Sequence, residues 1–426
     1  LMTGKYQSST GMVINELRLS PEHECFGHAL TKAGYHTAYI GKWHMWANEL
    51  GHHDETKNGF VPPGAYRLGF DGLWAAYNFN HTYYHSPYFT DSARRQIHKL
   101  YEPDSQTNMA IDWIRGAAKK QDPFALFLSW GPPHDPWGAD NVPPEYAEMF
   151  KDKRLPVRPN FSEQRDPYAD DWARPGADYY QNLPQFMRGY YAQTANIDWN
   201  LGRLTRALEE SGAAEDTMFV FTSDHGEMFG SHGRRAKYIF YEEAARVPLL
   251  MRWPGRTPKG RRSDVCFSSV DIMPTLLDMM NLPVPRAAEG VSFRRAALGQ
   301  GGGARDAAYL QGMGTTAAWK DGTEWRAIRD QQHTYATYRR DGKELLFDNR
   351  KDPYQMKNLA DDPASRTLRE DMDRRLAEWM KRTGDSWKYN WKAPVEDKGR
   401  LYRHGVFYTV DEYLEWAKQH PEAEPK

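Results

Sequence analysis

Short apolar runs that end in polar loops recur along residues 1–303. Their length and composition predict buried strands at 36–40, 124–130, 218–222 and 247–251. Between these runs, apolar residues recur at helical spacing and predict helices at 107–119, 185–212 and 270–280. Strand, loop and helix in alternation indicate an α/β fold whose mostly parallel sheet lies between helices.

A glycine-rich stretch at 299–303 predicts a domain boundary, because consecutive glycines favour no regular element. Beyond it, the pattern predicts antiparallel strands within 325–338 and 344–348, then a charged amphipathic helix over 364–382. We therefore divide the chain into a large α/β domain (1–303), a smaller C-terminal α+β subdomain (304–385) and an aromatic, charged tail (386–426). We expect the tail to fold back over one of the domains.

The segment 136–185 shows no clear hydrophobic period and is rich in Pro, Asp and Tyr. Loops of that length are uncommon in compact domains unless they shape a binding site. We therefore expect a long excursion over the surface that contributes to such a site.

Composition narrows the class of protein. The 56 Lys and Arg residues are balanced by 57 Asp and Glu residues, which argues against a nucleic-acid binder that relies on positive charge. The longest apolar runs have about seven residues, far short of the ~20 that span a bilayer, so we expect no membrane span. Two cysteines, Cys25 and Cys266, exclude a disulfide-dense scaffold and could form at most one bridge.

Ionisable side chains gather where the predicted strands end. Lys42 and His44 follow the first run, His134 follows the second, and Asp224 and His225 follow the third. Ligands of open α/β sheets bind outside the carboxyl ends of the strands. Because parallel strands share one direction, we expect these five residues to converge on one edge of the sheet.

Each of these residue types suits a particular chemistry. A carboxylate beside an imidazole, as in Asp224 and His225, makes half a site for a divalent cation. Lysines such as Lys42 and Lys237 are compact charges that suit a tetrahedral oxyanion. Histidines titrate near neutral pH and can act as general acids or bases.

A second interpretation stays open for each residue. Asp224 could cap a following helix, with His225 packed beneath it. A single lysine is usually a solvated surface residue, although Lys42 directly follows a buried run and Lys237 precedes an aromatic one. A single histidine is usually structural, although the prolines around His134 stiffen its loop.

Aromatic and histidine side chains crowd residues 74–88. They could face a sugar ring or an aromatic substrate. The interpretation that we favour is that they are ordinary core and surface aromatics.

Four ordered landmarks resemble the type I sulfatases. Residues 34–44 (GYHTAYIGKWH) look like the second signature of that family, and residues 1–4 (LMTG) resemble the end of its first signature. Residues 223–248, which begin with SDHGE and contain Lys237, resemble the family's metal-and-lysine segment. Residues 346–359 resemble part of its C-terminal subdomain. The resemblance therefore runs from Leu1 to about Arg382.

The resemblance implies an alkaline-phosphatase-like α/β fold and the hydrolysis of sulfate esters, with 1–303 as the catalytic domain. In that family a cysteine is oxidised to formylglycine, whose hydrate attacks sulfur. A divalent cation assists: Ca²⁺ first, with Mg²⁺ or Mn²⁺ as alternatives. Asp224 and His225 match two of its ligands.

The resemblance also implies roles for the remaining strand-end residues. Lys42 and Lys237 match the lysines that bind sulfate. His44 matches the histidine that assists the formylglycine hydroxyl, and His134 matches the histidine that protonates the leaving alcohol. A cation and two lysines together would neutralise charge on the sulfate oxygens in the transition state.

The matching positions for the nucleophile and for two further Asp ligands would lie before Leu1. Cys25 is no substitute, because residues 24–28 (ECFGH) lack the Pro and Arg of the first signature. We therefore expect the chain as printed to be an inactive scaffold with half a metal site. A formylglycine-generating or anaerobic maturation enzyme would be a partner of the full-length protein. Any signal peptide would also lie before Leu1, which leaves a periplasmic or secreted location open.

Two other functions stay open. A phosphonate monoester or phosphodiester hydrolase of the same superfamily would share the DHGE segment and its lysine, but not the GKWH signature. A non-catalytic carbohydrate-binding scaffold would suit a missing nucleophile, but has no reason to keep both lysines and the histidines together. For a sulfatase, the expected substrate is a sulfated carbohydrate or an aryl sulfate, with choline sulfate as a further possibility.

Overall fold

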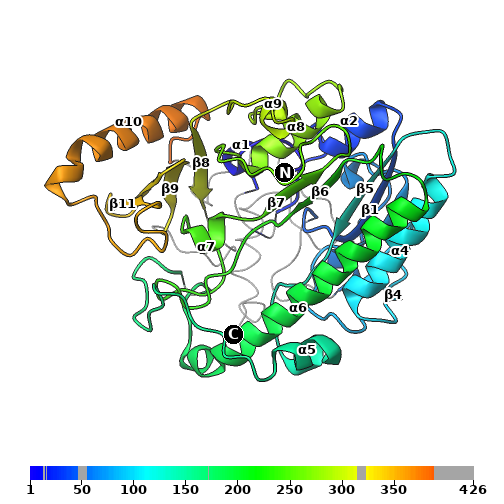
Figure 1. Cartoon of the computed structure of the whole chain (residues 1–426), viewed down its shortest axis with the longest axis horizontal. Helices are drawn as coiled ribbons and strands as arrows, with labels where there is room; N and C mark the ends of the chain where they lie inside the picture. The colour runs from blue at the N-terminus through cyan, green and yellow to red at the C-terminus, as the bar shows by residue number, and fades with distance from the viewer. Residues whose placement is uncertain (13–14, 16, 47–54, 171, 314–322, 388–426) are drawn as a thin grey trace.

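The computed structural model describes residues 1–12, 15, 17–46, 55–170, 172–313 and 323–387. A large α/β part carries most of the helices, and a smaller sheet covered by one long helix forms the C-terminal subdomain (Figure 1). The predicted tail falls almost entirely outside the described residues. The α/β class with a smaller C-terminal α+β subdomain is confirmed.

The central parallel sheet is built on β1 (His36–Lys42), which pairs with β2 (Leu73–Tyr77) on one side and β5 (Phe124–Ser129) on the other. Apolar residues on both faces of β1 suit a strand that is covered twice. Gly41 has a φ of 104°, and a Cβ there would lie 2.0 Å from the Ser129 carbonyl oxygen, so only glycine fits.

The other two predicted strands form a separate pair. β6 (Phe219–Thr222) runs antiparallel to β7 (Leu249–Arg252). β5 and β6 nevertheless contribute alternate residues to the same two hydrophobic clusters, one on each face. The two sheets therefore lie in one layer, and the carboxyl ends of β1, β5 and β6 point to the same region.

Helices cover both faces of this layer. α4 (Glu102–Ala117) and α6 (Ala177–Glu210) pack against one face, and α2 (Phe26–Lys32) and α8 (Ile272–Met279) pack against the other (Figure 1). α6 starts before the predicted residue 185 and passes through Pro184. Packing of its first turns into a cluster of Tyr179, Leu183 and Met187 compensates for the backbone hydrogen bond that proline removes.

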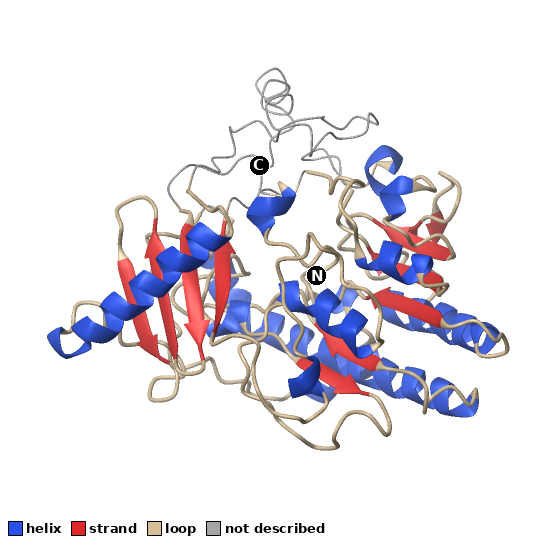
Figure 2. Ribbon diagram, turned by 90° about the horizontal axis from the view of Figure 1, so that it is seen from above, coloured by secondary structure: helices blue, strands red, loops and turns tan. Residues whose placement is uncertain are grey.

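The C-terminal subdomain is a four-stranded antiparallel sheet in the order β11-β10-β9-β8, with α10 (Arg366–Arg382) across one face (Figure 2). Its strands are β8 (Ala307–Gly312), β9 (Trp325–Asp330), β10 (His333–Tyr338) and β11 (Glu344–Asp348). The predicted strands and helix are confirmed, whereas β8 was not predicted. The N-terminal Tyr6 packs edge-on against Tyr309 of β8, with ring centroids 5.3 Å apart, which ties the two parts together.

Short elements complete the described chain. The remaining helices and strands are α1 (Gln7–Thr10), α3 (Thr56–Gly59), η1 (Ala65–Arg67), β3 (Pro87–Tyr88), β4 (Gln96–Ile97), η2 (Ala139–Asn141), α5 (Pro144–Phe150), α7 (Glu242–Ala245), η3 (Ser269–Asp271), α9 (Arg294–Ala297) and η4 (Pro363–Ser365). The segment 136–185 therefore contains two short helices and the start of α6.

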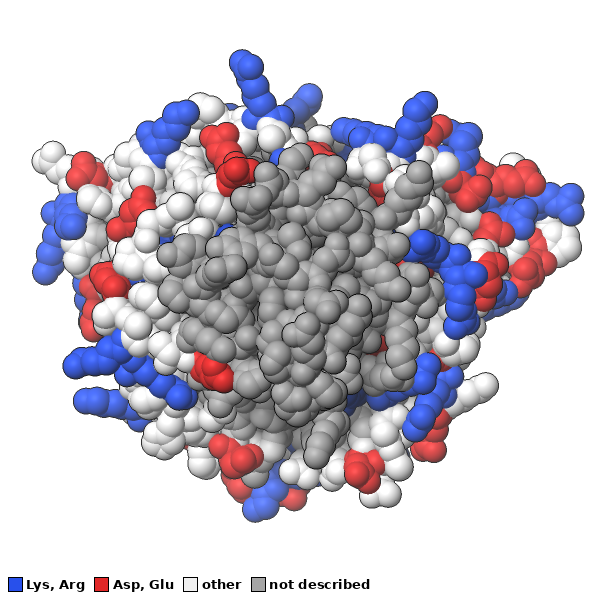
Figure 3. Space-filling model, turned by 180° about the vertical axis from the view of Figure 1, so that it is seen from behind, with Lys and Arg blue, Asp and Glu red and all other residues white. Residues whose placement is uncertain are grey.

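Charges of both signs alternate over the described surface seen in Figure 3, as the balanced composition predicts. Among the described helices, none is both long enough and apolar enough to cross a membrane.

Candidate active site

The loops that follow β1, β5 and β6 come together at one end of the layer. His134 lies in the loop after β5, and its ring centroid is 5.7 Å from that of His225, which follows β6. The His134 Nε2 atom is 2.6 Å from the Nζ atom of Lys237. The structure therefore brings His134 and Lys237 into direct contact across 103 positions of sequence, with the His225 ring beside them.

Lys42 and His44 form the β1 side of the site. The Lys42 ammonium lies 5.7 Å from the ring centroid of Phe79, and the His44 ring packs against the same phenylalanine with centroids 5.0 Å apart. Burial lowers the pKa of Lys42, and Asp224 and Asp135 oppose that shift. Burial, followed by the charges of Lys42 and Lys237, holds the pKa of His44 well below its usual range, so this imidazole is neutral.

His134 is held by hydrogen bonds at both ring nitrogens. Its Nδ1 atom is 2.5 Å from the Asp135 carboxylate, and its Nε2 accepts from the Lys237 ammonium. This arrangement selects the tautomer with the proton on Nδ1. Burial lowers the pKa of His134, and Asp135 opposes that shift. Burial and then the Lys42 charge lower the pKa of Lys237 to about 8.

The loop that carries His134 is anchored from below. Tyr83 donates its hydroxyl to the carbonyl of His134 at 2.9 Å. The buried carboxylate of Glu102 accepts from the Gly131 amide at 3.1 Å and from the Tyr77 hydroxyl at 2.8 Å. These contacts fix the position of the imidazole independently of any ligand.

Asp224 and His225 form the β6 side. The Asp224 carboxylate is 75% exposed and lies 3.5 Å from the Nε2 atom of His225. Burial alone would raise the pKa of Asp224, but His225 and the two lysines lower it to about 2. The first described helix after this segment is α7, so Asp224 does not cap a helix directly after it. The capping interpretation is therefore wrong.

The donor set of this pair fits a divalent cation. The Nδ1 atom of His225 lies 2.8 Å from the Gly226 carbonyl, which keeps the proton on Nδ1 and leaves a lone pair on Nε2. Burial lowers the pKa of His225 to about 4, so the ring is neutral at physiological pH. A neutral imidazole nitrogen and an ionised carboxylate oxygen on the same side are suitable metal ligands.

Lys237 is presented by a turn with unusual backbone geometry. Its neighbours Ala236 and Tyr238 have φ values of 62° and 66°, which side chains rarely adopt. The buried Glu227 carboxylate accepts a hydrogen bond of 2.5 Å from the Ala236 amide. The Lys237 ammonium also lies 4.8 Å from the ring centroid of Trp172. Glu227 therefore holds the turn that aims Lys237 at His134.

Besides Asp135, which holds Nδ1 of His134, two residues of the site were not predicted. The first is Glu227, which lies beneath Lys237. The second is His81, whose ring stacks on His134 with centroids 4.4 Å apart. Ligand atoms of His81, His134 and Asp135 all lie within 4.8 Å of one another. His81 reaches the site from a distant segment, for which the local sequence gives no signal, whereas Glu227 bonds to Ala236 only nine positions away.

The aromatic segment 74–88 is largely core. Trp74, Tyr77 and Tyr83 are buried, with 2%, 1% and 0% of their surface exposed. The favoured interpretation is confirmed for these three, and they do not face a sugar. Cys25 and Cys266 are both buried, unbridged thiols, and burial raises the pKa of Cys25 to about 12, which makes it a poor nucleophile.

The chain matches the models of known protein families. The family model described as Sulfatase matches residues 1–282, and the model of the N-sulphoglucosamine sulphohydrolase C-terminal region matches residues 230–382. An ulvan-active sulfatase from Formosa agariphila is 32% identical over 392 residues, which cover 91% of this chain and 72% of that protein.

Solved structures show the same architecture. The sulfatase yidJ from Bacteroides fragilis has a TM-score of 0.79 and 28% identity, covering 91% of this chain and 85% of that chain. A phosphonate monoester hydrolase from Silicibacter pomeroyi has a TM-score of 0.67 and 20% identity, covering 90% and 85%, and shows the shared fold alone. Members of the sulfatase family generally use a divalent metal and formylglycine. With its family model matched over more than half of its length, this chain belongs to the sulfatase family and is a sulfuric ester hydrolase of the alkaline phosphatase superfamily.

Proposed function

We propose that this sulfatase hydrolyses sulfate esters of a carbohydrate, and that Lys42, His44, His134 and Lys237 carry the reaction. The observation that supports this most is the 2.6 Å contact between Lys237 and His134, which joins a cation for sulfate and an acid for the leaving alcohol at one point. The similarity to an ulvan-active sulfatase supports a sulfated polysaccharide as the substrate class.

Lys42 and Lys237 would bind the sulfate oxygens. Two ammonium groups in a partly buried site stabilise negative charge more strongly than they would in water. Burial and then the charge of Lys42 lower the pKa of Lys237, and an anion between the two lysines would offset their repulsion. The neutral imidazole of His44 would hold the proton of the nucleophile's hydroxyl group.

His134 would protonate the departing alcohol oxygen. Because Nε2 carries no proton in the tautomer described above, the proton would pass from the Lys237 ammonium to Nε2 and from there to the alcohol oxygen, which leaves Lys237 neutral; Asp135 at Nδ1 stabilises the imidazolium form in between. Stacking on His81 fixes the ring between these two partners. Asp135, His134 and Lys237 already lie in series within hydrogen-bonding distance, which supports this role.

Asp224 and His225 would hold the divalent cation, with Ca²⁺ as the first choice and Mg²⁺ or Mn²⁺ as alternatives. When bound, the cation would supply positive charge to the sulfate oxygens. The resemblance places the formylglycine and two further carboxylate ligands before Leu1, and their formation would need a maturation enzyme.

The test compares substrates and forms of the protein. We expect the protein expressed from its complete coding sequence, with a maturation enzyme, to hydrolyse aryl sulfates and sulfated oligosaccharides, and residues 1–426 alone to show no turnover. In the complete protein, kcat/KM for an aryl sulfate should exceed that for the matching phosphate diester and phosphonate monoester. A diester or phosphonate preference of tenfold or more would contradict the proposal. Turnover by residues 1–426 would contradict the placement of the nucleophile.

A further inference from the structure

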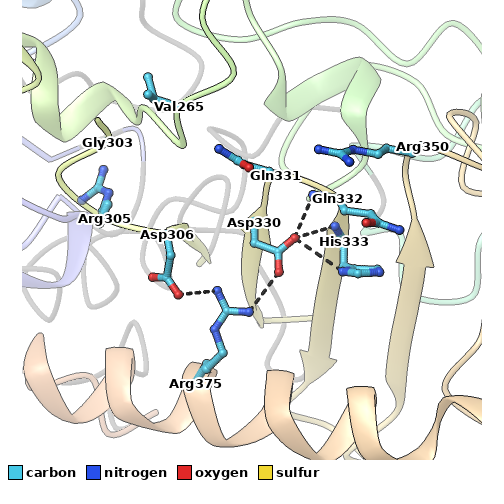
Figure 4. Close-up of a pocket in the computed structure, with 10 residues that line it drawn as sticks. All are labelled: Val265, Gly303, Arg305, Asp306, Asp330, Gln331, Gln332, His333, Arg350 and Arg375. Atoms are coloured by element: carbon cyan, nitrogen blue, oxygen red, sulfur yellow. Dashed lines mark hydrogen bonds and ion pairs between the residues drawn. The ribbon is translucent and has the colours of Figure 1, made fainter. Parts of the chain in front are cut away.

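A second polar crevice lies on the C-terminal subdomain (Figure 4). Its volume is about 720 Å³, within the range of small-molecule sites. Its walls come from the start of β8, the turn between β9 and β10, the turn after β11, and α10. Val265 and Gly303 of the large domain complete one side.

This crevice is separate from the candidate active site. β9 begins at Trp325, whose indole donates at 3.0 Å to the carbonyl of Tyr238, next to Lys237. The same strand ends at Asp330, which lines the crevice. At ~3.3 Å per residue, the strand sets the two places about 17 Å apart.

A rigid ion-pair frame forms the floor. Arg375 of α10 bridges the carboxylates of Asp306 and Asp330, each at 2.9 Å. The other oxygen of Asp330 accepts from the backbone amides of Gln332 and His333 at 2.9 and 2.7 Å. The guanidinium donors of Arg375 are already paired with carboxylates. Arg375 therefore holds the walls of the crevice together, and other side chains must bind the ligand.

Unused hydrogen-bond donors surround this frame. The structure gives the side chains of Arg350 and Gln331 no partner among the described residues, and both are exposed. Figure 4 shows Arg350 extending toward Gln331. Arg305 differs from them: it is only 6% exposed, its Nη2 pairs with Asp271 and its Nη1 is buried, so it supports the wall of the crevice and does not bind the ligand.

The balance of charge in the crevice limits the class of ligand that can bind there. The arginines of the crevice are opposed by Asp271, Asp306 and Asp330, so a bare anion meets little net positive field. The carboxylate of Asp306 is 80% exposed and can accept hydrogen bonds from hydroxyl groups. Forked arginine donors beside such acceptors match a molecule that carries both an oxyanion and hydroxyls.

We propose that this crevice binds an anionic sugar unit of a glycan chain, with its sulfate or carboxylate on Arg350 and its hydroxyls on Asp306 and Gln331. The ligand class rests on the proposed function, whereas the crevice itself does not. A polymer held here raises the effective concentration of its sulfate esters at the active site. The crevice therefore lowers KM for polymers and leaves small substrates unaffected.

The test is calorimetric binding of a sulfated carrageenan hexasaccharide to residues 1–426. The Lys42→Ala/Lys237→Ala background removes both cations of the active site, so binding there does not interfere. We expect Arg350→Ala to weaken binding about tenfold, the cost of one charge-assisted hydrogen bond pair. Gln331→Ala should weaken it in the same direction, because Gln331 is an exposed side chain of the same crevice. The desulfated hexasaccharide and inorganic sulfate should each bind at least about tenfold more weakly than the sulfated one.

The matched control is Arg366→Ala, which removes an exposed arginine of α10 outside the crevice. Unchanged binding in Arg350→Ala, equal weakening in Arg366→Ala, or inorganic sulfate binding as tightly as the hexasaccharide would each overturn the proposal. In the complete protein, Arg350→Ala should raise KM for the polysaccharide and leave kcat/KM for an aryl sulfate unchanged. If the complete protein hydrolyses no sulfate ester but the hexasaccharide binds as expected, the proposed function is wrong and the proposal for the crevice is still supported.

Discussion

The two sides of the candidate active site differ in how far the protein itself fixes them. On the side of His134 and Lys237, each ring nitrogen and the ammonium already has a partner within 2.6 Å, and Glu102, Tyr83 and Glu227 support the loops beneath. On the side of Asp224 and His225, the carboxylate is 75% exposed and accepts from the His225 backbone amide at 3.0 Å, while the two ligand atoms, its free oxygen and His225 Nε2, lie 3.5 Å apart without a hydrogen bond.

The two sides of the site are therefore preorganised in different ways. A hydrogen-bonded acid keeps its geometry without ligand, as catalysis by positioned groups requires. Among the described residues, the hydrogen bonds of Asp224 and His225 stay within residues 223–226, and their ligand atoms do not bond to each other, so a bound cation would add the link between them. The His134 side should therefore tolerate the loss of the metal, whereas the Asp224 side should not.

Removal of the metal should have the largest effect, and it tests the difference between the two sides of the site most directly. Treating the complete, matured protein with EDTA should abolish turnover of an aryl sulfate, because the charge opposite the sulfate oxygens is lost. Adding Ca²⁺, Mg²⁺ or Mn²⁺ separately should restore it, with Ca²⁺ the most effective. Full activity after dialysis against EDTA, with metal content verified as absent, would remove Asp224 and His225 from the mechanism.

The next largest effect should come from Lys237→Ala. Loss of one cation from the sulfate site should lower kcat/KM by about 10²–10³, on the scale of losing an oxyanion donor. Steady-state kinetics with an aryl sulfate measures the change. The matched control is Lys357→Ala, an exposed lysine of the C-terminal subdomain, which should leave kcat/KM unaltered.

The response of activity to added Ca²⁺ should distinguish Lys237→Ala from Asp224→Asn, a variant on the other side of the site. Asp224→Asn should recover part of its activity as the Ca²⁺ concentration rises, because a weakened site fills by mass action. Lys237→Ala should not recover at any Ca²⁺ concentration. Equal rescue of both variants would show that the two sides are not independent.

Much of this site could be predicted because strand direction is a global property. Lys42, His134 and Asp224 follow β1, β5 and β6, and the common direction of buried strands brings such loops together. The separate β6–β7 pair could not be predicted, because an apolar run of four or five residues carries no information about its partner strand.

The supporting residues were hidden for a different reason. Glu227 acts on the Ala236 amide, and His81 stacks on His134 across more than fifty positions of sequence. Such contacts exist only once the fold is formed, so neither periodicity nor turn chemistry reports them. β8 was missed because Ala307–Gly312 directly follows a glycine-rich stretch and has too few β-branched residues to stand out.

A smaller and more selective effect should follow from His134→Ala. Alkyl sulfates leave as poor alkoxides and need the acid, so their kcat/KM should fall by about 10²-fold or more. Activated aryl sulfates leave without protonation and should lose less than about tenfold. Kinetics over a series of leaving groups should therefore show a steeper dependence on leaving-group pKa in the variant. A uniform loss across the series would assign His134 to sulfate binding.

The smallest effect on catalysis should come from Glu102→Gln. This variant tests how much the buried Glu102, which supports the His134 loop, changes the stability of the protein with pH. Burial raises the pKa of Glu102 from 4.5 to about 7, although Ser86, Tyr77 and the Gly131 amide lower it in part. A shift of that size corresponds to roughly 3 kcal/mol. The folded protein keeps this proton longer than the unfolded chain does, so the stability from Glu102 is complete below pH 4.5 and falls as the pH rises through about 7.

The neutral glutamine can still accept from Gly131 and contact Tyr77, but it has no proton to lose. The free energy of unfolding of Glu102→Gln relative to the unchanged protein should therefore increase between pH 4.5 and 7, while kcat/KM changes less than about threefold. Urea unfolding of residues 1–426 at several pH values measures the first quantity, and an aryl sulfate assay of the complete protein measures the second. If the stability difference is the same at both ends of this pH range, Glu102 is ionised in the folded protein, and the His134 loop is held by a charge instead of a buried neutral acid.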